Sequence, residues 1–156
     1  MTDFFEPSEY YTGPVLTDSL VAHAQEILGV ILPRSYIDLL RVRNGGVPRR
    51  RCFHTNFSTS WAKDHFEVQA VRGIGGDWGI DSVQGLGSGD MIREWEYPPI
   101  GVVVCDTPAA GADTVMLDYR GVSGIGEPSI AYVDEDRIPR TVASTFSQFI
   151  RGLTES

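Results

Sequence analysis

Apolar residues near the start of the chain recur with the period of a helix. They make one continuous stripe, formed by Leu20, Val21, Ala24, Ile27 and Leu28. Thr17 and Asp18 precede the stripe, and both are good N-caps because their side chains accept hydrogen bonds from the free N–H groups of a first turn. Gly29 follows it and favours a helix end. The pattern therefore predicts a first helix between these two signals.

A second helix is predicted directly after the first. Pro33 suits a first helical turn, where its missing N–H has no helical partner to lose. The helical period then places four residues on one face: Tyr36, Leu39, Leu40 and Arg43. The segment Asn44-Gly45-Gly46 tolerates left-handed backbone angles, so we expect it to end this helix.

The middle of the chain has a weaker, β-like pattern. Residues 51–57 and 66–74 each alternate between apolar and polar positions well enough to predict a strand. The glycine-rich segment 73–89 is interpreted as a long surface loop. Short helical turns are expected at residues 80–86 and 90–96.

The last third has the clearest pattern. The continuous apolar run at residues 100–106 predicts a central strand that is buried on both faces. Residues 113–119 and 129–134 predict two further strands. Ser144 can cap a final helix. Its apolar stripe consists of Phe146, Phe149, Ile150 and Leu153.

This order of elements predicts an α+β fold with a mixed or antiparallel sheet and with the helices from both chain ends packed on one side. The chain has 156 residues, enough to bury a core without a disulfide or a metal. Residues 1–14 are aromatic and acidic and are interpreted as an N-terminal arm, and residues 15–156 as a single domain.

The charge balance constrains the partner. The chain carries 13 basic and 21 acidic residues, for a net charge of −8. Such a surface repels phosphate backbones and attracts basic macromolecules, so we expect no nucleic-acid partner. Solubility alone is the alternative explanation of the charge.

Localisation is predicted from the two cysteines and from the absence of targeting signals. Cys52 and Cys105 lie in apolar runs, which favours buried free thiols in a reducing compartment, although a disulfide between them stays open. The start of the chain has neither a basic nor an apolar signal region. The longest apolar run, residues 100–105, is too short to span a bilayer. We therefore expect a cytoplasmic protein that does not enter a membrane.

The sequence gives little support for a catalytic or cofactor-binding motif. The segment Gly73-Ile74-Gly75-Gly76-Asp77-Trp78-Gly79 has Trp78 where a dinucleotide fingerprint needs its third glycine. No phosphate-binding loop, zinc-ligand spacing or nucleophile elbow occurs. Aspartates recur near the late strands and could hold a cation, but aspartate is also favoured in turns for local hydrogen bonds. We therefore expect no enzyme activity, no cofactor and no metal.

Three tryptophans, Trp61, Trp78 and Trp95, lie in or beside the irregular middle, each near acidic residues. Tryptophan surrounded by rim charges is typical of residues that dominate binding at protein interfaces. The alternative is that each one covers the core beneath the long loop.

Two sets of residues resemble the SUKH superfamily, which includes bacterial toxin-immunity proteins and a fungal cell-wall regulator. The first set consists of Leu16-Thr17, Leu28-Gly29, Leu32-Pro33, Tyr36, Leu40 and Asn44-Gly45-Gly46. The second consists of Ile100-Gly101, Asp113, Leu117-Asp118-Tyr119, Gly126-Glu127-Pro128, Tyr132-Val133-Asp134, Phe146, Phe149 and Leu153. Residues 49–99 do not align. The resemblance implies an α+β fold and a non-enzymatic role, since many bacterial members bind and neutralise a co-encoded toxin, often a nuclease.

These observations give a hypothesis for the partner-binding surface. The predicted residues are acidic or aromatic positions that core packing explains least: Asp77, Trp78, Asp81, Glu94, Trp95, Glu96, Asp106 and Asp113. The expected partner is a basic cognate toxin, because opposite fields speed encounter. Two alternatives stay open, a regulatory scaffold without a toxin and, more remotely, a cation-dependent hydrolase that uses the late aspartates.

Overall fold

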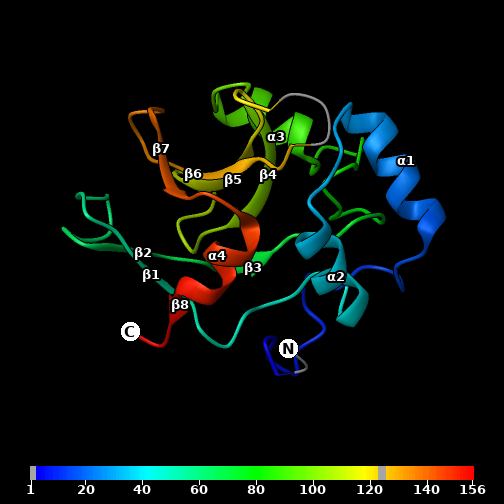
Figure 1. The fold of residues 1–156 in the computed structure, drawn as a ribbon, viewed down its shortest axis with the longest axis horizontal. Coiled ribbons are helices and arrows are strands. Elements are labelled where there is room, and N and C mark those ends of the chain that lie inside the picture. Colours follow the sequence, from blue (N-terminus) through cyan, green and yellow to red (C-terminus); the bar gives the residue numbers. More distant parts are fainter. Residues whose placement is uncertain (1–2, 123–125) are drawn as a thin grey trace.

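A computed structural model describes residues 3–122 and 126–156 (Figure 1). The elements in chain order are α1 (Asp18–Leu28), α2 (Arg34–Val42), β1 (Cys52–His54), β2 (His65–Glu67), β3 (Ala70–Val71), α3 (Ser88–Trp95), β4 (Gly101–Asp106), β5 (Thr114–Asp118), β6 (Ser129–Val133), β7 (Pro139–Ala143), α4 (Phe146–Gly152) and β8 (Leu153–Thr154).

The strands form two sheets in which neighbouring strands run antiparallel. The larger sheet has the order β3-β4-β5-β6-β7, and the smaller has the order β2-β1-β8. The α+β prediction is therefore confirmed, in its antiparallel form. Strand β4 is an inner strand with Val102 to Cys105 buried, as its apolar run predicts, but the central place belongs to β5, all five residues of which are buried.

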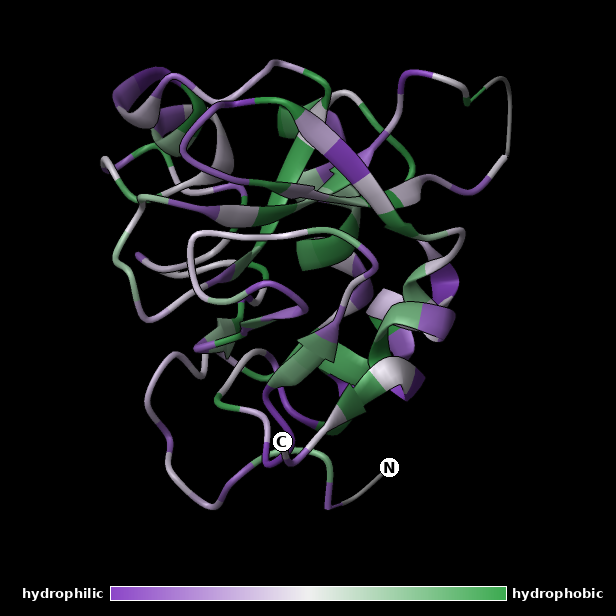
Figure 2. Cartoon of the chain, turned by 90° about the vertical axis from the view of Figure 1, so that its left-hand side faces the viewer, coloured by the Kyte–Doolittle hydropathy of each residue, from purple (hydrophilic) through white to green (hydrophobic). Residues whose placement is uncertain are grey.

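Both faces of the larger sheet are covered. Helices α1, α2 and α4 contribute to the core on one face together with Val102, Leu117 and Tyr132. This arrangement confirms the prediction that helices from both chain ends share one side. The opposite face, with Val103 and Met116, packs against residues of α3, a layer that the sequence pattern did not place. Figure 2 shows apolar residues concentrated in the inner strands and polar residues on the outer turns.

The smaller sheet connects the C-terminal segment to the middle of the chain. Strand β8 follows α4 directly and pairs with β1. The ring of Phe53 on β1 stacks on Phe66 of β2 and on Phe149 of α4, at centroid distances of 5.5 and 4.9 Å. The predicted strand at residues 66–74 is wrong in one respect: it is split into β2 and β3, which belong to different sheets.

Several local predictions hold and others need correction. Helix α1 begins after its cap Thr17, whose side chain accepts the Leu20 N–H, and ends at Gly29 with φ of 70°. Ile27, however, is 48% exposed and does not belong to the buried stripe. Helix α2 ends before the Asn44-Gly45-Gly46 segment, and Arg43 is already extended. Thr145, not Ser144, caps α4.

The segment predicted as a surface loop also contributes to the core. Ile74 and Ile80 are fully buried, because glycines let residues 73–89 turn back toward the sheet. Cys52 and Cys105 are buried free thiols, as predicted. Within the described residues, no helix is long and apolar enough to cross a membrane.

Residues 3–14, the described part of the predicted arm, lie along the segment that follows α2. Phe5 is 5% exposed and pairs with Pro48 as an isolated bridge. The Glu6 N–H donates to the Val47 carbonyl, and the Gly13 N–H donates to the Asn44 carbonyl, each at 2.8 Å. These contacts place the aromatic part of residues 3–14 against the body of the protein.

Candidate functional site

The eight residues predicted to face a partner divide into two classes. Asp77, Trp78, Glu94, Trp95 and Glu96 are exposed, whereas Asp81, Asp106 and Asp113 hold the fold together by hydrogen bonds. The prediction that all eight lie on one partner-facing surface is therefore wrong for Asp81 and Asp113, which are buried, whereas Asp106 is partly buried and paired with Arg72. Each of the three makes specific contacts within the fold.

Asp113 is the most enclosed of the three and is 1% exposed. Its carboxylate accepts hydrogen bonds from the Trp61 indole N–H at 2.7 Å and from the hydroxyl groups of Thr107 and Tyr132. Burial and the hydrogen bond to Asp113 raise the pKa of Tyr132 well above its usual value, so the phenol stays protonated and donates. Asp113 therefore links the β4–β5 turn to β6 and to Trp61, and it is not free to contact a partner.

Asp106 lies at the end of β4 and is paired with Arg72, a guanidinium that is only 3% exposed. The Arg72 Nε–H donates to the Asp106 carboxylate at 2.8 Å, and its second nitrogen donates to the Leu86 carbonyl. A buried guanidinium needs such a counter-charge. Asp106 is thus committed mainly to neutralising Arg72.

Asp81 is 8% exposed and accepts the Gly75 N–H at 2.8 Å. Gly75 and Gly76 have φ of 81° and 72°, in the left-handed region that favours glycine. Together these features close the turn that carries Asp77 and Trp78 at its exposed end. Asp81 shapes the loop and does not face outward.

Trp78 lies in an aromatic cluster that the sequence pattern did not predict. Its ring centroid is 5.3 Å from that of Tyr11 and 6.3 Å from that of Tyr10, and the two tyrosine rings are 4.5 Å apart. We call Tyr10, Tyr11 and Trp78 the Trp78 cluster. A cavity of about 200 Å³ opens beside it, lined in part by Tyr11, Asp77 and Trp78. The sequence feature that could have indicated this cluster is the adjacent pair Tyr10-Tyr11 in an acidic segment.

The side chain of Asn44 brings the two halves of the Trp78 cluster together. Asn44 is 3% exposed. Its amide nitrogen donates to the carbonyls of Pro14 and Ile74, at 2.7 Å each, and its amide oxygen accepts the Ile74 N–H at 2.8 Å. One buried amide thus links the segment after Tyr11 to the segment before Trp78.

The other exposed group lies at the end of α3. Glu94, Trp95 and Glu96 are consecutive and exposed, and Glu96 ends the helix with φ of 57°. The Arg137 Nε–H donates to the Trp95 carbonyl at 3.0 Å. Among the residues that the structure describes, no aromatic pair or hydrogen bond joins this group to the Trp78 cluster.

Replacing Gly111 by alanine should displace Trp95 and destabilise the fold by about 2 kcal/mol. Gly111 has φ of 104°, and a Cβ there would overlap the Trp95 ring. Urea unfolding and the NMR signal of the Trp95 indole N–H would measure both effects. Gly121→Ala is the control, since a Cβ there meets no atom within 4 Å. Equal behaviour of the two variants would contradict this account of Trp95.

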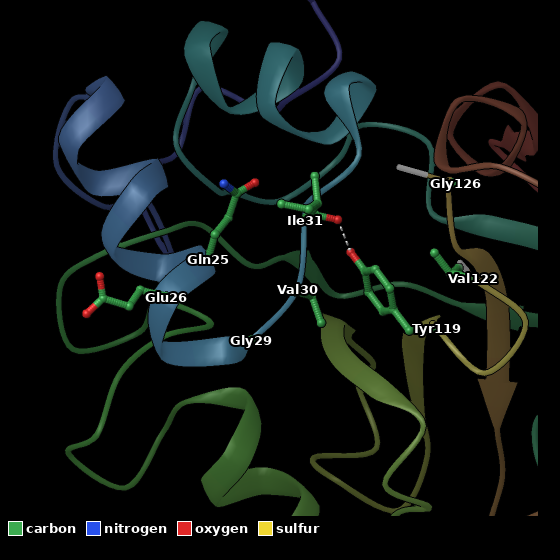
Figure 3. Close-up of a pocket in the computed structure, with 8 residues that line it drawn as sticks. All are labelled: Gln25, Glu26, Gly29, Val30, Ile31, Tyr119, Val122 and Gly126. Atoms are coloured by element: carbon green, nitrogen blue, oxygen red, sulfur yellow. Dashed lines mark hydrogen bonds between the residues drawn. The ribbon is translucent and has the colours of Figure 1, made fainter. Parts of the chain in front are cut away.

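A cavity of about 520 Å³ lies where the end of α1 and residues 29–31 approach Tyr119 (Figure 3). Glu26 is the one carboxylate in its described lining. The Tyr119 hydroxyl donates to the Ile31 carbonyl at 2.7 Å, and burial raises its pKa. The described part of the lining therefore offers neither a pair of carboxylates nor an activated nucleophile.

The described residues contain no group of three or more His, Cys, Asp or Glu side chains that could hold a metal ion. The late aspartates are instead distributed among structural pairs: Asp113 with Tyr132, Asp118 with Arg120, and Asp136 with Arg140. What the site offers chemically is two exposed tryptophans flanked by carboxylates, which is a composition suited to binding a protein.

Comparison with known families agrees with the fold. The family model described as SUKH_6, SMI1-KNR4 cell-wall, matches residues 18–150. A search of curated proteins gave no significant match. The matched region runs from the start of α1 into α4 and so includes both sheets apart from β8. The chain therefore belongs to the SMI1-KNR4 family of the SUKH superfamily.

Proposed function

We propose that this protein is a non-enzymatic immunity protein that binds and neutralises a basic cognate toxin. The observation that carries the proposal is the pair of exposed tryptophans, Trp78 at 44% and Trp95 at 37% exposure, each with carboxylates beside it in the chain. Exposed tryptophans are frequent binding hot spots. Membership of the SUKH superfamily supports the same class of function.

The charge of the chain supports a basic partner. The net charge is −8, and Asp77, Glu94 and Glu96 are exposed beside the two tryptophans. An acidic surface raises the rate at which a basic protein is encountered and disfavours nucleic acid as a competing ligand. Nuclease toxins are suitable partners in this respect, because enzymes that act on phosphate backbones carry basic surfaces.

A non-enzymatic role is supported by how the buried acids are used. Asp113 and Asp106 have their carboxylates occupied by donors within the protein, and the cavity beside Tyr119 contains no acid–base pair in its described lining. A regulatory scaffold is the second candidate, favoured by the cell-wall description of the matching family. It would use the same exposed residues for a partner that is not toxic.

Co-expression with the product of the adjacent gene, followed by purification, tests the proposal. We expect a stoichiometric complex and rescue of cells that the adjacent product poisons. A complex without toxicity would favour the scaffold, and recovery of the free protein in every pairing would contradict both.

The charge-reversed variant Asp77→Lys with Glu94→Lys should bind the toxin about tenfold more slowly at low salt, since it removes steering charge beside both tryptophans. Stopped-flow fluorescence would measure the association rate. Glu155→Lys is the control for net charge, since Glu155 is exposed and lies at the other end of the chain. Because the control has one charge reversal and the tested variant has two, the change in association rate is compared per substitution. An equal slowing by this control would show that the effect is not local.

A further inference from the structure

Two of the three aromatic residues in the Trp78 cluster are exposed to solvent. Tyr10 is 56% exposed and Trp78 is 44% exposed, although their rings contact one another and Tyr11. The rings are held edge to face, with interplanar angles of 62° for Tyr10–Trp78 and 65° for Tyr11–Trp78. The cavity of about 200 Å³ is lined in part by Tyr11 and Trp78. The cluster is thus a preformed, partly apolar recess at the surface.

One carboxylate, Asp77, lines this recess, and others lie next to its tyrosines. Asp77 is exposed and directly precedes Trp78, and Glu9 is exposed and directly precedes Tyr10. Asp106 lies near Tyr11, and burial together with this carboxylate raises the pKa of Tyr11 to about 12. The phenol therefore stays neutral, and the negative charge of the recess belongs to the carboxylates.

The nearby basic residues are already engaged within the fold. Arg72 is paired with Asp106, and Arg43 donates to the carbonyls of Glu6 and Ser8. The cation–π contacts found within the described chain use other rings, with Arg137 over Tyr97 at 4.8 Å and Arg140 over Phe57 at 5.7 Å. In residues 3–122 and 126–156, no cation lies over Trp78.

The Trp95 group differs in this respect. Arg137 donates to the Trp95 carbonyl, so a guanidinium already lies close to that tryptophan. Gly111 packs directly beneath the Trp95 ring, which covers one of its faces. A cation from a partner is therefore favoured at Trp78 over Trp95.

We propose that the Trp78 cluster binds an arginine side chain of the partner protein, with the guanidinium stacked on an aromatic face and paired with Asp77. Arginine fits because its planar guanidinium stacks on aromatic rings and bonds a carboxylate with two parallel N–H groups. The lining combines aromatic rings with a carboxylate, which suits the methylene stem and the charged head of arginine. This inference deepens the proposed function and rests on it for the identity of the partner.

Titration of the 15N-labelled protein with N-acetyl-arginine amide tests the site without a toxin. The indole N–H signals of Trp61, Trp78 and Trp95 report three environments in one sample: hydrogen-bonded to Asp113, in the cluster, and exposed beside Arg137. We expect a saturable shift of the Trp78 signal and smaller shifts of the other two.

N-acetyl-citrulline amide has the same shape without the charge. It should bind at the Trp78 cluster about threefold more weakly than the arginine probe, because the cation–π and ion-pair contributions are lost. Asp77→Asn should weaken the arginine probe about twofold. N-acetyl-lysine amide should bind more weakly than arginine. Equal binding of arginine and citrulline, or no response of Trp78, would overturn the inference.

The outcomes of these experiments distinguish a failure of the arginine site from a failure of the proposed immunity function. In the co-purified complex, Trp78→Ala should reduce affinity more than Trp95→Ala. A toxin complex that is insensitive to Trp78→Ala, with no arginine response, removes the site and leaves the immunity function standing. An arginine response without any toxin complex leaves the site standing and removes the immunity function.

Discussion

Replacing Asp113 by alanine should lower the free energy of unfolding by about 4 kcal/mol, the largest effect expected of any acidic residue discussed above. Asp113 is 1% exposed and accepts hydrogen bonds from Trp61, Thr107 and Tyr132. Without the carboxylate, three donors are left without their partner in a buried site, and each unsatisfied group carries a desolvation cost. Urea unfolding, followed by the near-UV signal of the aromatic residues, measures the change.

Asp77→Ala is the matched control, since Asp77 is exposed, and it should change stability by no more than about 0.5 kcal/mol. Asp113→Asn should lie between the two, at about 2 kcal/mol, because an amide keeps one acceptor but also places an N–H group against the donors. If Asp113→Ala proved as stable as Asp77→Ala, Asp113 would return to the set of residues available to a partner.

Asn44→Ala should destabilise the protein by about 3 kcal/mol and separate the two halves of the Trp78 cluster. The buried Asn44 amide makes three hydrogen bonds, to Pro14 and twice to Ile74. Asn44→Asp has the same shape but places carboxylate oxygens against two carbonyl groups, so it should be at least as destabilising at neutral pH. Urea unfolding and the Trp78 indole signal would measure the two consequences separately.

Asn56→Ala is the control for these variants, because Asn56 is exposed. We expect it to leave both stability and the Trp78 signal unchanged. A stable Asn44→Ala protein with an unaltered Trp78 signal would show that glycine turns alone hold the loop. In that case Asn44 would not be a positioning residue for the cluster.

The parts of the fold that depend on local chemistry were predictable. The Thr17 cap, the Gly29 end and the buried face of α4 follow from side chains close together in the chain. Inner strands with continuous apolar runs, such as β4, were also identified. Strands β7 and β8 were missed because one is a half-exposed edge strand and the other has two residues, so neither has an apolar pattern.

Local chemistry did not predict which residues of the candidate site are exposed and which are buried. Asp77 and Asp113 both lie in turns, where aspartate is common for local reasons. What makes Asp113 buried is its contact with Trp61 and Tyr132, which are 52 and 19 residues away in the chain. The segment Asn44-Gly45-Gly46 was understood as a helix end, and Gly45 does have φ of 93°. The pattern of hydrophobic and polar positions does not reveal that the Asn44 side chain forms hydrogen bonds with residues 30 positions away.

The Asn44 link has a consequence for which substitutions the exposed surface tolerates. The exposed rings belong to two short stretches that meet at one interior amide, whereas the stacked phenylalanines of β1, β2 and α4 lie elsewhere. Substitutions at Tyr10, Tyr11, Asp77 or Trp78 therefore alter the side chains offered to a ligand without opening the interior. The exposed side chains of this surface are therefore expected to tolerate substitution while the scaffold stays unchanged.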